Sequence, residues 1–438
     1  MMAIDMKELY VAKDYEAICS AGDELEADGR LAELSQYDFG CYIRSLYKLK
    51  RYDDCLAAYK LFHRAYPESG YVDDTMGWAL YQTHLKDKES FRQDRDRYLR
   101  QVEFIIRHNS GTQYSPLKRV VLKAVELLLK DKKEKKARKT DHRDYELADQ
   151  YLDALDPAGL SIEQRKWEDG GRIQRMMSDR EKWYNYKSKA LLGLEEYEAC
   201  ISCCAAALDS IRRFTKQQDM WLKYRQAKSY LHMGEPDSAA QALEDLLQGR
   251  VGNWNIYGLA YDIARQQGDA DRAICYASAA ALVDDSHEMR VKLYADLVPL
   301  LVEQHEERAA MLHQQLVDRI NAANGRSAYR WKVAWSVPAD IAAMDKKSIL
   351  RELEPFWKKM RDKNKVFTTG RVKRILPSGR DGFITSDDGH DYYFRFDDLE
   401  DRRAAVKEGS KVRFTLGQHE NRKKHVREFN AVEITLVG

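Results

Sequence analysis

The sequence has few of the features that mark secreted, membrane-spanning or disulfide-stabilised proteins. Its 438 residues include only eight prolines and seven cysteines, and the cysteines are odd in number and scattered along the chain. Such cysteines predict reduced thiols and a cytoplasmic protein. The longest apolar runs, such as 120–129, are interrupted by charged residues, so we expect no membrane-spanning segment. Residues 1–13 also carry charged side chains and lack the continuous apolar core of a signal peptide.

Neither sign of charge dominates the chain. Lys and Arg total 73 and Asp and Glu total 71, so the net charge is +2. Two segments have a local basic surplus: 130–144 has eight basic and four acidic residues, and 363–438 has sixteen and twelve. Both surpluses can attract phosphate groups. Mixed-sign runs on helices are more often solvated faces, and this is our interpretation of 130–144.

The sequence also lacks the short motifs that mark common catalytic sites. It contains no P-loop motif, no dinucleotide fingerprint, no H-E-x-x-H zinc motif and no nucleophile elbow. Adjacent carboxylates such as Glu195-Glu196 and Asp284-Asp285 lie at predicted turns, where helix capping accounts for them. We therefore expect a protein that is not an enzyme, with no catalytic residue, no metal site and no cofactor.

Most of the chain has the pattern of α-helices. Before about residue 363, Ala and Leu recur at spacings of three and four residues, and Gly mostly separates these runs. A chain of 438 residues is also too long for a single domain of ordinary size. The sequence therefore predicts a multidomain protein whose larger part is helical.

Four segments of the helical part share one pattern, in which a helix ends, a short turn follows, and a second helix has a small residue near its start. These segments are 49–55, 192–200, 233–239 and 267–273. Their small residues are Cys55, Cys200, Ala239 and Ala273. The pattern resembles that of tetratricopeptide repeats (TPRs), in which two antiparallel helices cross closely at the small residue. The resemblance implies an α-solenoid whose concave groove binds a protein partner.

The repeat pattern is lost between residues 73 and 156, although long helices are still predicted at 90–107 and 116–138. We interpret this region as degenerate repeats or an insertion. A short cysteine cluster, Cys200 to Cys204, contains a C-x-x-C without a second cysteine or histidine pair at zinc spacing. Its three cysteines share one face of a helix, so we predict that they pack in the core.

The segment 324–365 connects the repeats to the end of the chain. Between Tyr329 and Val337, aromatic and apolar residues alternate with other residues, which is typical of a strand. This stretch either docks on the last repeat as an extended segment or forms a loop whose Trp side chains fill the end of the solenoid. A helix is predicted from about Lys346 to Met360, bent at Pro355. Residues 361–365 then form a charged hinge without apolar anchors.

The C-terminal segment 366–438 has a different pattern. Short alternating apolar runs are separated by Gly, Asp and Pro, which is typical of a small all-β barrel. The runs include 370–375, 380–385, 391–396 and 412–416. Their order and spacing resemble a cold-shock domain, a five-stranded OB-type barrel. The resemblance implies binding of single-stranded RNA or DNA.

The resemblance to the cold-shock family also assigns individual residues. Phe383 matches the second aromatic of the family's first RNA-contacting motif, whereas Asp381 replaces the first aromatic and Arg374 replaces a preceding Trp. Residues 392–396 match the second motif, with Arg in place of its His. The resemblance implies that bases stack on Phe383, Tyr393 and Phe396. It implies stacking or phosphate contacts by Lys373, Arg374, Arg380 and Arg395.

The sequence thus predicts a multidomain α + β protein, in which an α-helical TPR-like solenoid is followed by a small all-β OB-type barrel. The predicted domains are 1–323 for the repeats, 324–365 for the connecting segment and helix, and 366–438 for the barrel. The predicted function is a non-enzymatic adaptor, whose barrel binds single-stranded RNA or DNA and whose repeats bind a protein. The alternative is a pure protein-interaction scaffold or a regulatory subunit, for example in a bacterial stress or phage-defence operon, whose barrel does not bind nucleic acid.

Overall fold

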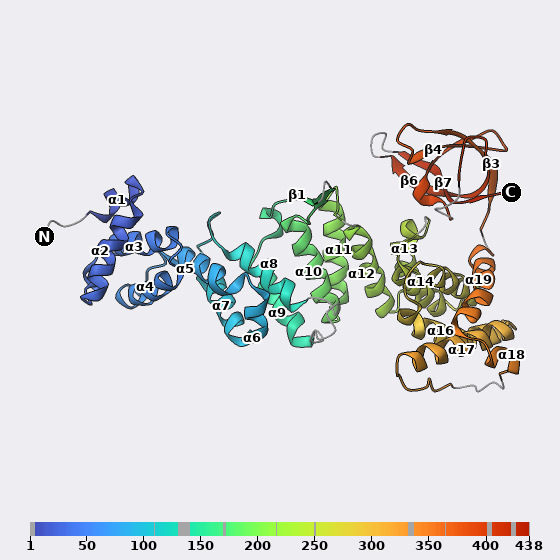
Figure 1. Cartoon of the computed structure of the whole chain (residues 1–438), viewed down its shortest axis with the longest axis horizontal. Helices are drawn as coiled ribbons and strands as arrows, with labels where there is room; N and C mark the ends of the chain where they lie inside the picture. The colour runs from blue at the N-terminus through green and yellow to red at the C-terminus, as the bar shows by residue number, and fades with distance from the viewer. Residues whose placement is uncertain are drawn as a thin grey trace. The chain divides into compact units, whose positions relative to one another are not determined.

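A computed structural model describes most of the chain, and its helices precede a closed five-stranded barrel (Figure 1). The described residues are 5–108, 110–129, 141–169, 172–215, 217–248, 251–331, 337–363, 365–400, 405–421 and 426–437. Residues 130–140 of the basic run, 332–336 of the alternating stretch and Asn364 of the hinge lie outside them. The chain divides into two compact units, Met1–Leu222 and Lys223–Gly438. The predicted fold class, helices followed by a small all-β barrel, is confirmed.

The first unit is helical with one β-hairpin. Its helices are α1 (Met6–Ala12), α2 (Tyr15–Ala27), α3 (Gln36–Lys48), α4 (Tyr52–Ala65), α5 (Asp73–Leu80), α6 (Lys88–Gln93), α7 (Arg95–Arg107), α8 (Leu117–Leu128), α9 (His142–Asp153), α10 (Asp179–Gly193), α11 (Tyr197–Ser210) and the start of α12 (Gln218–His232). Strands β1 (Lys166–Asp169) and β2 (Arg172–Arg175) pair antiparallel between α9 and α10. The helix predicted at 90–107 is divided at Asp94, whose carboxylate accepts the backbone N–H of Arg97 and so starts α7.

The second unit contains the remaining helices and the barrel. The helices are α13 (Pro236–Leu247), α14 (Trp254–Gln266), α15 (Ala270–Ala281), α16 (Val291–Glu303), α17 (Glu307–Ala323), α18 (Ala339–Ala342) and α19 (Lys346–Asp362). The strands are β3 (Thr368–Ile375), β4 (Asp381–Ser386), β5 (Asp391–Arg395), β6 (Lys411–Asn421) and β7 (Val426–Leu436). The helix predicted from Lys346 to Met360 is confirmed as α19, and Pro355 lies inside it.

The predicted helix–turn–helix junctions share one backbone geometry. At the junction between α3 and α4, Lys50 has a positive φ of 63°, and its N–H donates to the Tyr47 carbonyl at 3.0 Å. The next N–H, of Arg51, donates to the Leu46 carbonyl at 2.9 Å. This is the Schellman arrangement, which satisfies carbonyl groups that a helix end leaves unpaired. The same geometry recurs at Lys13, Glu195, Gly234, Gly268 and His305.

A buried residue follows each of these turns by five positions. The four residues predicted to lie at close helix crossings, Cys55, Cys200, Ala239 and Ala273, are all 0% exposed, so their predicted burial is confirmed. Cys200 Sγ lies 3.3 Å from the Ser188 carbonyl of α10, which shows how little space the crossing leaves. Of the other cysteines in that cluster, Cys204 is buried and Cys203 is half-buried. The core packing predicted for this cluster is therefore confirmed for Cys200 and Cys204.

The described part of the alternating stretch contains no strand. Trp331 instead packs as part of a loop, and its indole N–H donates to Asp318 Oδ1 of α17 at 3.2 Å. Trp331 and Val337 both pack against the core that α16, α17 and α19 share. Of the two interpretations of this stretch, the loop that packs its Trp side chain on the last helices fits the described residues.

A buried aromatic cluster holds α19 against α16 and α17. The Trp357 indole N–H donates to His313 Nε2 at 3.0 Å, and His313 Nδ1 lies 2.7 Å from the Ala309 carbonyl. Because indole can only donate, Nε2 accepts and the imidazole proton lies on Nδ1. Tyr294 stacks on Trp357 with ring centroids 5.9 Å apart, and His287 bonds to the Tyr294 hydroxyl. Burial lowers the pKa of both histidines to about 4.

The charged hinge is held by ion pairs. Arg361 pairs with Glu400 of the barrel at 2.6 Å and with Asp362 at 2.7 Å. Lys365 pairs with Glu433 of β7 at 2.5 Å, and these five side chains are only 13–24% exposed. The prediction that the hinge lacks apolar anchors overlooked this possibility, because charged residues can fix a linker as well as solvate it. Half-buried ion pairs of Lys365 therefore join the segment between α19 and the barrel to Asp362 of α19 and to Glu433 of β7.

The first prediction concerns the pH dependence of folding. Both buried histidines are neutral in the folded state, with pKa values near 4, whereas an unfolded chain binds a proton near pH 6.5. Above about pH 6.5 these histidines should not lower the free energy of unfolding. As the pH drops toward 4, the free energy of unfolding should fall by up to about 1.4 kcal/mol per pH unit for each histidine. Melting temperatures measured from pH 7.5 to 4.5 check this. His313→Gln should flatten the profile, and His63→Gln, at an exposed position of α4, should leave it unchanged.

The second prediction concerns the hinge. Lys365→Met leaves the Glu433 carboxylate without its cation, whereas Asp362 keeps Arg361, so the cost should lie between about 1 kcal/mol, as for an exposed pair, and about 3–5 kcal/mol, as for a buried one. Chymotrypsin should then cleave near Phe367 faster than in the unmodified protein. Lys363→Met is the matched control, because its pair with Asp271 is about half exposed on both sides. Equal protection of the two variants would contradict an ionic attachment.

Candidate functional site

The barrel closes in the strand order β3-β4-β5-β7-β6. All its neighbouring strands are antiparallel except β5 and β7, which pair parallel at Tyr393 and Asn430. The barrel core consists of buried residues, namely Val372, Ile384, Phe394, Leu399, Val412, Phe414, Ala431 and Ile434. Side chains that alternate with these residues point outward. The predicted nucleic-acid residues lie mainly on the outer surface of β3, β4 and β5 and in the turn before β4.

A β-bulge in β3 sets which side chains reach that surface. The register with β4 shifts between Val372 and Arg374, so that Arg374 lies opposite Phe383. Strict alternation would turn Val372 and Arg374 to the same side, but Val372 is buried and Arg374 is exposed. The extra residue, Lys373, is exposed as well. The bulge therefore brings two adjacent cations to the outer surface.

Three of the predicted residues form a continuous row across the strands. The guanidinium carbon of Arg374 lies 5.6 Å from the centroid of the Phe383 ring, which is a cation–π distance. Phe383 is paired with Tyr393 of β5, and their rings meet edge to face with centroids 5.9 Å apart. We call these three residues the barrel row. Their partly exposed rings and planar guanidinium are the kinds of surface on which bases stack.

Asp381 orients one end of the barrel row. Its carboxylate accepts the Tyr393 hydroxyl at 3.2 Å and the Ser378 hydroxyl at 2.7 Å. Burial and then the charge of Asp381 raise the pKa of the Tyr393 hydroxyl above its usual value of 10. Tyr393 therefore remains a hydrogen-bond donor at neutral pH. The residue that replaces a family aromatic thus fixes the neighbouring ring, and it also adds a negative charge beside it.

Two of the predicted cations already have carboxylate partners. Lys373 pairs with Asp391, whose other oxygen accepts the Thr385 hydroxyl at 2.6 Å, and the hydrogen bond from Lys373 lowers the pKa of that carboxyl. Arg395 Nε lies 3.7 Å from Asp398. Lys373 and Asp391 are both exposed, and such pairs are typically worth about 0–1 kcal/mol. A phosphate group can therefore displace the Asp391 carboxylate at small cost.

The other two predicted residues lie apart from the barrel row. Arg380 is exposed in the turn before β4, and its carbonyl accepts the Phe396 N–H at 2.9 Å. Phe396 follows β5 in a short 3-10 turn and packs against the barrel core, with its ring 5.5 Å from that of buried Phe394. Alternation along β5 explains this, since it directs Tyr393 and Arg395 outward and Phe394 and Phe396 inward. That alternation is the signal that a motif comparison alone missed.

Sequence reasoning also missed a second arginine–aromatic contact on the barrel. Arg413 of β6 lies over Phe367, with its guanidinium carbon 4.1 Å from the ring centroid. Arg413 lies on β6, which pairs with β3 on the side of β3 away from β4. No motif pointed to this pair, because Phe367 precedes the first strand.

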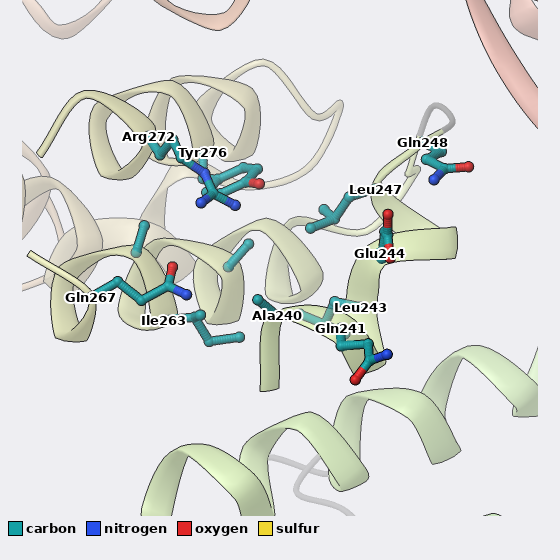
Figure 2. A pocket seen from close by; sticks show the side chains of 12 residues that line it. Ala240, Gln241, Leu243, Glu244, Leu247, Gln248, Ile263, Gln267, Arg272 and Tyr276 are labelled. Atoms are coloured by element: carbon teal, nitrogen blue, oxygen red, sulfur yellow. The ribbon is translucent and has the colours of Figure 1, made fainter. Parts of the chain in front are cut away.

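The helical part of the second unit has a hollow between α13, α14 and α15 (Figure 2). Its volume is about 480 Å³, within the range of ligand pockets. Leu243, Ala260 and Ile263 form an apolar floor, and Arg272 and Gln267 are polar residues of its lining. The Gln267 amide nitrogen donates to Asp237 at 2.7 Å, while its buried oxygen has no hydrogen-bond partner among the described residues.

Comparisons with known proteins cover parts of the chain. A family described as "Domain of unknown function (DUF7017)" matches residues 220–346. A tetratricopeptide repeat protein of known crystal structure from Parabacteroides merdae is similar at 13% identity, with 68% of this chain and 99% of that chain covered and a TM-score of 0.28. A search of curated proteins finds no significant match.

Two features are absent from the residues that the structure describes. Within them, no helix is both long enough and apolar enough to cross a membrane. Across the same residues, no three or more His, Cys, Asp or Glu side chains are grouped so that they could hold a metal ion.

Proposed function

We propose that the protein is a non-enzymatic adaptor whose barrel binds single-stranded RNA, or single-stranded DNA, and whose helical repeats bind a protein. The observation that carries the proposal is the barrel row, in which Arg374, Phe383 and Tyr393 lie side by side across three strands. Stacking on such side chains is worth roughly 1–3 kcal/mol per base and tolerates any base. The row is therefore suited to single strands, whose bases are free to stack.

The strand order of the barrel supports this proposal. The first strand pairs with the second and the fourth, and the third runs parallel to the fifth, which is the order of an OB-type barrel. Barrels of this type bind oligonucleotides on the face of strands two and three and through the loop between strands one and two. Phe383 and Tyr393 lie on those two strands, and Arg380 lies in that loop. The resemblance to cold-shock domains implies the same ligand contacts, which supports the proposal.

The protein-binding part of the proposal is supported by the hollow between α13, α14 and α15. Its apolar floor suits an aliphatic side chain, and Gln267 and Arg272 add polar groups to its lining. A peptide supplies both an apolar side chain and backbone N–H groups. Helical repeat pairs of this kind present extended surfaces to peptides and proteins.

A pure scaffold, or a regulatory subunit, is the second candidate. One observation favours it, because Lys373 and Arg395 are already paired with carboxylates and Asp381 adds a negative charge to the row. In this alternative the row contacts a protein surface, and the cations stay in their intramolecular pairs.

The third prediction separates the two candidates. In the full-length protein, Phe383→Ala and Tyr393→Ala should each weaken binding of a labelled oligouridine by roughly 5- to 150-fold, with little change in salt dependence. Lys373→Ala should instead reduce the salt slope by about one phosphate contact. Fluorescence anisotropy at two salt concentrations measures both effects, and circular dichroism confirms that each variant is folded.

Two further variants act as controls for the barrel row. Phe367→Ala removes a partly exposed ring that also lies under an arginine but on the other side of β3, so affinity should stay the same. Asp381→Phe removes the negative charge and adds an aromatic ring, so affinity should rise. If the folded Phe383, Tyr393 and Asp381 variants all bind like the unmodified protein, the barrel row is not a nucleic-acid surface and the scaffold remains.

A further inference from the structure

The β1–β2 hairpin of the first unit is largely exposed to solvent along β1. Its strands pair Lys166 with Arg175 and Trp167 with Gln174, while the turn between them lies outside the described residues. Residues 165–168 are all exposed, and 54% of Trp167 is accessible to solvent. Two-stranded hairpins are at best marginally stable in water without a packed face. Met176, on the same face, is 48% exposed as well, so the hairpin exposes two apolar side chains together, which points to a role in binding.

One face of the hairpin combines an aromatic ring with a positive charge. Directly opposed residues of an antiparallel pair share a face, so Trp167 lies with Gln174. The next residues on that face are Arg165 and Met176, joined by a 2.9 Å hydrogen bond from the Met176 N–H to the Arg165 carbonyl. We call these four residues the Trp face. None of its described side chains is acidic, and Trp167 makes no hydrogen bond or ring contact with the described residues.

Several basic residues around the hairpin form no ion pairs within the described part of the chain. Arg165, Lys166 and Arg175 form no ion pair with any residue that the structure describes. The same holds for Arg213 after α11, whose carbonyl accepts the Gln164 amide at 2.9 Å and so stays close to β1. This differs from the barrel, where Lys373 and Arg395 have carboxylate partners. Phosphate groups can therefore bind at the hairpin without first breaking an intramolecular ion pair.

We propose that the β1–β2 hairpin is a second contact site for single-stranded nucleic acid. A base stacks on Trp167, and the neighbouring phosphate binds Arg165 on the same face, while Lys166 and Arg175 lie on the opposite face of the hairpin. The inference rests on the proposed function for the class of ligand, but it uses residues of the other unit. Unpaired cations and a free indole ring favour a nucleic acid over an acidic polypeptide, which would need the strand edge more than the ring. A chain of bases and phosphates uses both features at once.

The test uses the full-length protein and a labelled oligouridine of about twenty nucleotides. Trp167→Ala should weaken binding at least fivefold with an unchanged salt slope. Arg165→Gln, which removes the cation on the Trp face, should reduce the salt slope by about 0.7, the contribution of one single-strand phosphate. The controls are Tyr114→Ala, an exposed ring elsewhere in the unit, and Lys60→Gln/Arg64→Gln on exposed positions of α4. Both controls should bind like the unmodified protein.

Crosslinking provides a second readout that does not depend on affinity. An oligouridine containing 4-thiouridine should crosslink to the peptide that carries Trp167, and mass spectrometry should detect this product in the unmodified protein. It should persist in the Phe383→Ala/Tyr393→Ala variant if the hairpin contacts RNA by itself. If the hairpin variants lose affinity and the barrel variants do not, the hairpin contacts the nucleic acid and the barrel does not. That result would support this inference and contradict the role of the barrel in the proposed function.

The opposite results would overturn the inference. If the folded hairpin variants bind oligouridine like the unmodified protein and no crosslink forms at Trp167, the hairpin does not contact nucleic acid, whatever the barrel variants show. Binding of a twelve-residue poly-glutamate peptide that depends on Trp167, without any effect on oligouridine, would assign the hairpin to an acidic protein partner instead. Circular dichroism and melting temperatures establish that each variant is folded.

Discussion

The helical parts of this protein depend on one backbone constraint, the left-handed residue that ends a helix and lets the next helix return against it. Gly occupies this position at Gly234 and Gly268, but Lys50, Glu195 and His305 adopt the same positive φ. A residue with a side chain pays roughly 1–2 kcal/mol for that conformation. The two hydrogen bonds of each junction and the close helix crossing that follows compensate for this cost. The same turn geometry therefore recurs in this chain with different residues in the turn.

This constraint explains which repeats could be predicted from the sequence. Junctions with a small residue five positions later, such as Cys200 and Ala239, were recognised. The junction at Lys13 was missed because Ile18, which is not small, stands at that position, whereas the junction at His305 was missed although Ala310 is small. The hairpin was missed for another reason: its described residues are exposed, so no apolar face produced an alternating pattern. Conversely, alternation near Trp331 suggested a strand, but that ring packs on α17 from a loop. An alternating pattern reports which side chains are buried, and it marks a strand only where an extended backbone buries one of its two faces.

The barrel row could be predicted only in part for a similar reason. A motif comparison identified Phe383 and Tyr393, and the structure places them together. The bulge that turns Arg374 outward is a backbone feature without a sequence signature in a single chain, and it decides whether the third member joins the row. Phe396 was assigned to the ligand because the motif contains it; its ring is partly exposed and packs against the barrel core. The motif comparison treated Asp381 as the loss of a stacking aromatic. In the structure, its carboxylate accepts a hydrogen bond from the Tyr393 hydroxyl and so orients the Tyr393 ring.

The paired cations of the barrel also have a consequence for selectivity. At Lys373 and Arg395, a phosphate group must displace a carboxylate, so the net gain from each contact is smaller than at an unpaired cation. Salt weakens the internal pair and the phosphate contact together, which makes the salt dependence shallower than the number of cations suggests. Base stacking then supplies a larger share of the affinity, because it does not compete with an existing interaction. Under the proposed function, such a surface would discriminate against duplexes, whose bases are already stacked, and would favour strands whose bases are free.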